Sequence, residues 1–280
     1  MSFRLPVDIG CQTFPTESTY AATLFAPMFT RIRAPDNAAN PHPPAPQRAA
    51  MNVPPTQVTR VSAGLVGGAQ GCGIISHGKY RPVFVQQGDL DGACGTHCLF
   101  MALMAMRVIP TSRFFPMDER RMGADLRRLY RLARTFYFSG TDSRDFRKLL
   151  RLVRPKIEFD ATEATDTAAE QFIAKHLQHG RLVIVGIESA ARKLNHWVLA
   201  IGQAGIEQKG VFQPRKFLIV DPGDDPDRLV PWNATLETGA MPNSRLFRSL
   251  CDLRGEAATV RLSGAIAIAA PSARAQLRSA

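Results

Sequence analysis

The segment that decides the predicted fold is Gln86-Gln87-Gly88-Asp89-Leu90-Asp91-Gly92-Ala93-Cys94-Gly95-Thr96-His97-Cys98-Leu99-Phe100-Met101-Ala102-Leu103. It begins with turn-forming residues and continues as an apolar run, which predicts a buried helix from Cys94 to about Met106. Cys94 then lies in the first turn, where free backbone N–H groups and the helix dipole favour a thiolate and can stabilise an oxyanion. The segment therefore suggests a cysteine nucleophile, if the rest of the chain supplies a base.

Composition limits the class of protein. The chain has 280 residues, 45% of them hydrophobic, which is enough for a sizeable core. No run of about 18 apolar residues and no Sec-type start occur, so we expect no membrane span. We expect the protein in the cytoplasm, or secreted by a specialised system into the cytosol of a target cell. Five cysteines, an odd number, argue for a reducing compartment, and the sequence predicts neither a metal site nor a cofactor.

Positive charge is concentrated in one part of the chain. The formal net charge is +11, and residues 113–156 contain thirteen Lys or Arg against five acids, a surplus of +8. The simplest interpretation is the solvated outer face of two amphipathic helices. An acidic surface on a partner protein is the alternative, and binding of nucleic acid is not favoured.

The composition also divides the chain. Residues 1–80 are predicted to be a largely disordered N-terminal region, because 34–73 is rich in Pro, Ala, Asn and Gly and has little apolar surface to bury. Residues 81–270 are predicted to form the folded domain, and 271–280 a tail. Gly67-Gly68 lies in the predicted linker.

The predicted order of elements indicates the fold class. Amphipathic helices are expected over 117–137, 142–153 and 165–179. Buried strands are expected over 182–187, 196–202 and 216–221, with one or two closing strands over 257–260 and 265–269. Helices followed by strands predict an α+β domain in which a helical layer packs on an antiparallel sheet.

A cysteine hydrolase also needs a base, a group that orients the base, and an oxyanion hole. His196 begins one predicted strand and can serve as the base. Asp221 ends the next strand, where it can fix the tautomer of His196. Gln87 is the candidate oxyanion donor, with Gln86 as a close competitor.

These residues resemble a known family. The run Cys94-Gly-Thr-His-Cys-Leu-Phe-Met101 is similar to the CGxxCLxM motif of the double-glycine leader peptidases, which are papain-like cysteine peptidases. The upstream Gln87, His196-Trp197-Val198 and Val220-Asp221-Pro222 extend the resemblance over roughly 81–225. It implies a papain-like fold, with Cys94 as nucleophile, His196 as base, Asp221 as orienting acid and Gln87 in the oxyanion hole.

The resemblance also implies a substrate. The family cleaves after paired glycines, so the resemblance implies a stand-alone cysteine endopeptidase that cuts a protein or peptide at a small-residue site. It also makes Gly67-Gly68 a candidate site of self-processing. Soluble peptidases of this type resemble toxins or effectors that bacteria deliver into other cells, which implies a delivery or immunity partner. An isopeptidase acting on ubiquitin-like tails or an acyltransferase could use the same triad. A binding protein on an inactive scaffold, using the basic 113–156 surface, is the non-enzymatic alternative.

Overall fold

The computed structural model describes residues 54–88, 91–115, 119–189, 195–239, 241 and 247–271. The chain divides into two units at Val53, and the first of them lies outside the described residues. The predictions for residues 1–53 and for the tail beyond 271 therefore concern parts of the chain that the structure does not describe.

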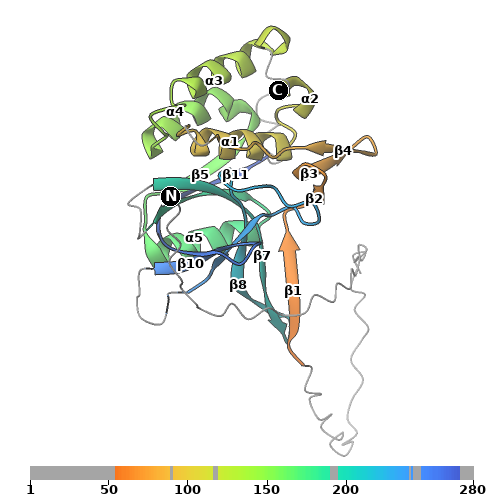
Figure 1. Ribbon diagram of the computed structural model, residues 1–280, viewed down its shortest axis with the longest axis vertical. Helices are drawn as coiled ribbons and strands as arrows, with labels where there is room; N and C mark the ends of the chain where they lie inside the picture. The colour runs from red at the N-terminus through yellow and green to blue at the C-terminus, as the bar shows by residue number, and fades with distance from the viewer. Residues whose placement is uncertain are drawn as a thin grey trace, which may run out of the picture. The chain divides into compact units, whose positions relative to one another are not determined.

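A ring of six antiparallel strands forms the centre of the second unit (Figure 1). Its strands are β6 (Leu182–Ser189), β7 (Asn195–Gln208), β8 (Val211–Val220), β9 (Ala234–Glu237), β10 (Phe247–Asp252) and β11 (Ala257–Ala269). They run in the order β7-β6-β11-β10-β9-β8, and β8 pairs again with β7, which closes the barrel. Two further strands extend the ring: β1 (Thr56–Val61) pairs with β7, and β5 (Glu158–Thr162) pairs with β11.

The predicted fold class was wrong. The sequence favoured a papain-like α+β fold with a helical layer on an antiparallel sheet, whereas the structure is mainly strand and closes into a barrel. The sequence pattern missed β9 and β10, the two strands that link β8 to β11. It left open whether 257–260 and 265–269 are one strand or two, and the structure has one continuous strand, β11, with a bulge between Leu262 and Gly264. Strand patterns are local, so they do not reveal whether the first and last strands of a sheet pair.

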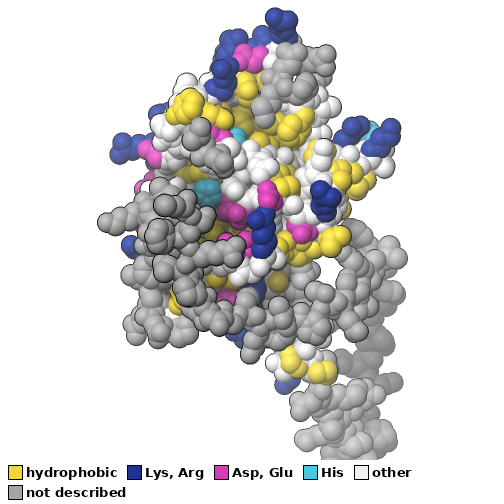
Figure 2. Space-filling model, viewed as in Figure 1, with side chains coloured by type: hydrophobic (Ala, Val, Ile, Leu, Met, Phe, Trp, Pro, Cys, Tyr) yellow, Lys and Arg dark blue, Asp and Glu magenta, His cyan; other side chains and the backbone are white. Residues whose placement is uncertain are grey.

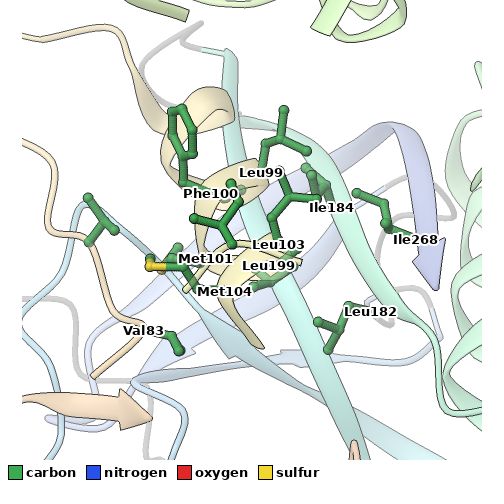
Figure 3. Close-up of a cluster of buried hydrophobic side chains, with 14 of the residues drawn as sticks. Val83, Leu99, Phe100, Met101, Leu103, Met104, Leu182, Ile184, Leu199 and Ile268 are labelled. Atoms are coloured by element: carbon green, nitrogen blue, oxygen red, sulfur yellow. The ribbon is translucent and has the colours of Figure 1, made fainter. Parts of the chain in front are cut away.

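Four of the barrel strands bury both faces over part of their length, at 182–187, 198–203, 217–220 and 264–268, which explains the apolar runs in these segments. In β6, Val183 and Val185 belong to a cluster to which β7, β8, β9 and β11 also contribute and against which Leu250 of β10 packs, so this cluster fills the interior. The helix α5 (Asp166–Gln178) adds Ile173 to that interior. Leu182 and Ile184 point the other way and pack with the apolar residues of a second helix, α1, as Figure 3 shows.

The helix α1 (Cys94–Ala105) packs on the outside of the barrel with almost every side chain buried. Its burial explains the continuous apolar run from which it was predicted. The other helical segments are α2 (Thr111–Phe114), η1 (Glu119–Arg121), α3 (Ala124–Arg134), α4 (Ser143–Val153) and η2 (Arg154–Lys156). The helix predicted over 117–137 is therefore shorter, whereas α4 begins as predicted, at a capping box made by Asp142. None of the helices in the described ranges has the length and apolar character needed to cross a membrane.

Residues 54–82 differ from the predicted disordered region. After β1, the strands β2 (Leu65–Gly68), β3 (Gly71–Ser76) and β4 (Lys79–Pro82) form a separate antiparallel sheet. Its glycines permit close packing, because a Cβ on Gly67 would lie 2.6 Å from the carbonyl oxygen of Leu229 and one on Gly68 would lie 2.4 Å from the ring of Tyr80. Gly67-Gly68 is thus a paired part of a strand, and we do not propose it as a self-processing site.

A buried ion pair joins α5 to the barrel. Arg248 on β10 is 1% exposed in its side chain, and its Nε donates to Glu170 Oε2 on α5 over 2.8 Å. Replacing Arg248 with alanine would leave the Glu170 carboxylate without this partner, so we expect the free energy of unfolding to fall by about 3–5 kcal/mol. Urea titration measures this change. Arg215→Ala, at an exposed arginine on β8, is the matched control and should change stability little; equal losses in both variants would contradict the assignment.

Candidate active site

The loop before α1 is shaped by the side chain of Asp91. Its Oδ2 accepts a hydrogen bond from the backbone N–H of Gly88 over 2.7 Å, and its Oδ1 accepts from Ala93 N–H over 3.0 Å. Ala93 is the N-cap residue of α1, so the carboxylate holds the loop in the position where the helix starts. Cys94 follows as the first residue of the helix and is 5% exposed.

A second contact fixes the same loop to the turn after α3. The Gly92 N–H donates to the Tyr137 carbonyl over 2.6 Å. A Cβ on Gly92 would lie 2.9 Å from the backbone nitrogen of Gly140, so only glycine permits this approach. The indole of Trp197 donates to the carbonyl of Thr141 over 2.7 Å, which joins the same turn to β7. The nucleophile loop, the turn after α3 and the start of β7 are therefore held together.

The structure brings the three predicted catalytic side chains together. His196 lies near the start of β7 and Asp221 directly follows β8, and the two strands are neighbours in the barrel. His196 Nε2 and Asp221 Oδ1 are 2.7 Å apart, and the side chain of Cys94 lies close enough to the same imidazole to raise its pKa. Asp221 is 6% exposed, and its Oδ1 also accepts the N–H of Gly223 over 2.8 Å.

The surroundings of His196 keep its ring protonated. Burial lowers the pKa of the imidazole, but the hydrogen bonds to Asp221 and Cys94 and their negative charges outweigh burial and raise the pKa to about 10. Asp224, on the same turn as Asp221, has a pKa raised to about 6, because of burial and then the charges of Asp221 and Asp252. The site therefore holds a cationic imidazole within a group of carboxylates at neutral pH.

The two glutamines point to different partners. The side-chain amide of Gln87 donates to the carbonyl of Asp91, and its own backbone N–H donates to the carbonyl of Pro222 over 2.7 Å. Gln87 thus joins the nucleophile loop to the turn that carries Asp221. Gln86 is exposed, and its amide donates to Asp225 over 3.2 Å. This arrangement favours Gln87 over Gln86 as the oxyanion donor, because Gln87 is half-buried between the nucleophile loop and the Asp221 turn, whereas Gln86 is exposed and bonds Asp225. The Gln87 amide retains a second N–H for an oxyanion.

The other buried thiols are in a different setting. Burial raises the pKa of Cys72 to about 12, and it raises the pKa of Cys98 well above the usual range, with the charges of Cys94 and Asp221 adding to the effect. Cys98 is fully buried, with Sγ 3.3 Å from the carbonyl oxygen of Trp197. Both thiols are therefore packing residues and poor nucleophiles.

The basic segment forms a solvent-exposed surface. In Figure 2, Lys and Arg side chains gather at the end of the molecule where Figure 1 places α3 and α4. Several of these side chains pair with local carboxylates, as Arg131 and Arg134 do with Glu119 over 2.9 and 3.0 Å. These exposed pairs agree with the interpretation as a solvated helix face; an acidic partner for this surface stays a prediction.

Two further findings concern the class of protein to which this site belongs. Within the described ranges, no group of three or more His, Cys, Asp and Glu side chains is placed to hold a metal ion. No protein-family model matches the chain, and no curated protein matches it either. The assignment of a class to this site therefore depends on the geometry of its own residues.

Sequence reasoning missed two residues that shape the site. Asn233 binds the backbone of Asp221, and Asp224 adds a carboxyl group near His196. No motif surrounds Asn233, which lies 12 residues beyond Asp221. Asp224 was visible in the sequence only as one of several acids after Asp221-Pro222-Gly223.

Proposed function

We propose that this protein is a cysteine peptidase that cleaves a protein or peptide substrate. The observation that carries the proposal is the assembly of Asp221, His196 and Cys94 from three separate segments of the chain, with Asp221 hydrogen-bonded to His196 and Cys94 close to the same imidazole. A thiol at a helix N-terminus, beside an imidazole that a buried carboxylate orients, is the arrangement that nucleophilic acyl transfer requires.

The geometry supports a two-step mechanism. The Cys94 sulfur attacks the substrate carbonyl, and the imidazolium of His196 gives its proton to the departing amine, which leaves a thioester on Cys94. His196, now neutral, takes a proton from water, whose oxygen attacks the thioester and releases the carboxylic acid. Asp221 keeps the Nε2–H of His196 in place, which leaves Nδ1 as the nitrogen that gives and takes the proton in the two steps.

Two N–H donors would stabilise the oxyanion. One is the backbone N–H of Cys94, which lies in the first turn of α1 and so has no intrahelical partner, and the other is the second N–H of the Gln87 amide. The imidazole of His196 has 27% of its side chain exposed, which allows contact with a bound substrate. The resemblance to the double-glycine leader peptidases supports this function through the order of the site residues, although not through the fold.

The proposal is tested by looking for new protein ends. Lysate is incubated with the purified chain, and newly formed N-termini are identified by mass spectrometry, with Cys94→Ala as the matched control. We expect N-termini that the wild type generates and the variant does not, with small residues such as paired glycines before the cut. Identical sets of N-termini from both proteins would remove the peptidase proposal.

A further inference from the structure

The turn that carries Asp221 is held by a buried asparagine outside the triad. Asn233 immediately precedes β9, is 4% exposed, and lies beside the end of β8. Its Oδ1 accepts the backbone N–H of Asp221 over 2.7 Å, and its Nδ2 donates to the carbonyl of Asp221 over 2.8 Å. A single amide group therefore satisfies both backbone groups of the residue that orients His196.

The side-chain amide of Asn233 also contacts two residues further along the same turn. Nδ2 also approaches the carbonyl oxygens of Asp224 and Asp225, at 3.4 and 3.3 Å. The main chain of Asn233 is fixed as well, because its N–H donates to Ile219 over 3.0 Å and its carbonyl accepts from Leu253 over 3.2 Å. The side chain thus projects from a rigid part of the barrel onto the turn.

The backbone of Asp221 depends on these hydrogen bonds to Asn233, because β8 ends at Val220. The backbone of Asp221 lies beyond the β8–β9 pairing, whose last pair is Ile219 with Ala234, and the amide of Asn233 takes the place of further ladder bonds. The position of that backbone decides where Oδ1 lies, and Oδ1 must accept from His196 and from Gly223 at once.

We infer that Asn233 is a positioning residue of the catalytic site, which fixes the Asp221 carboxylate against His196 and through it the reactivity of Cys94. This inference rests on the proposed function. A merely structural asparagine would affect stability alone, whereas a positioning residue also affects the titration of His196 in the folded protein.

The test compares Asn233→Ala with Gln203→Ala. Gln203 is the matched control because it is also a buried amide of the barrel, 2% exposed, and bonds the carbonyl of Ala174 on α5 over 3.1 Å, away from Asp221. Two readouts are measured on folded protein: the pKa of the His196 ring by NMR titration, and the rate of Cys94 alkylation by iodoacetamide at neutral pH, mapped by mass spectrometry.

We expect Asn233→Ala to lower the pKa of His196 and to slow alkylation of Cys94 by about tenfold, whereas Gln203→Ala changes neither. Asn233→Ser, which retains one hydrogen bond, should give intermediate values and takes the place of the alanine variant if that variant does not fold. An unchanged pKa and rate in a folded Asn233 variant would overturn the inference. If wild-type Cys94 itself shows no enhanced reactivity, the proposed function fails instead.

Discussion

Replacing Cys94 with alanine is expected to lower proteolytic turnover by at least about a thousandfold while the fold is retained. The variant has no sulfur to form the thioester, and neither His196 nor Asp221 can replace it as a nucleophile. Loss of one sulfur atom at the start of α1 leaves the apolar contacts of the helix in place, so the circular dichroism spectrum should be that of the wild type.

Cys98→Ala is the matched control for this variant. Cys98 lies one turn further along α1 and is fully buried. Its substitution should lower thermal stability, because it creates a small cavity, and should retain turnover. A Cys94→Ala protein with wild-type turnover, or a Cys98→Ala protein that folds but is inactive, would contradict the assignment of the nucleophile.

The second large effect concerns pH. Free histidine loses its proton near pH 6.5, whereas His196 keeps it until the pH rises through about 10. Below that value the imidazolium attracts an anionic reagent, so Cys94 should react about tenfold faster with iodoacetate than it would without the positive charge. As the pH rises through about 10, this preference for iodoacetate over the neutral iodoacetamide should disappear.

His196→Asn provides the comparison for the pH prediction. The variant has no titrating ring, so its ratio of iodoacetate to iodoacetamide rates should be low and independent of pH in this range. A wild-type ratio that instead falls near pH 6.5 would show that Asp221 and Cys94 do not raise the pKa of His196, and it would contradict the electrostatic account of the site.

The sequence predicted the local elements of the site better than their global arrangement. The apolar run of α1 and the strands β7 and β8 are strong periodic signals, so the sequence predicted that Cys94 starts a helix, that His196 lies near the start of one strand and that Asp221 lies at the end of the next. Closure of the barrel depends on the pairing of β7 with β8 and on the short strands β9 and β10, which have weak sequence patterns.

The glycines before Tyr80 led to the other wrong prediction, that of a disordered region. The Gly-rich composition before Tyr80 was interpreted as flexibility, yet Gly67 and Gly68 are required because neighbouring atoms occupy the space of a side chain. Composition does not distinguish these two uses of glycine. The choice between Gln86 and Gln87 was likewise open in the sequence, since only the fold shows that Gln87 contacts both the nucleophile loop and the Asp221 turn.

The most direct measurement of the central claim is the alkylation rate of each cysteine at pH 6, in the folded chain and in urea, by peptide mapping. The imidazolium of His196 should make Cys94 react faster in the folded chain than in the unfolded one, although the side chain is mostly buried. Cys72 and Cys98 should react only after unfolding, because burial raises the pKa of both thiols. A Cys94 that reacts more slowly in the folded chain than in urea would contradict the account.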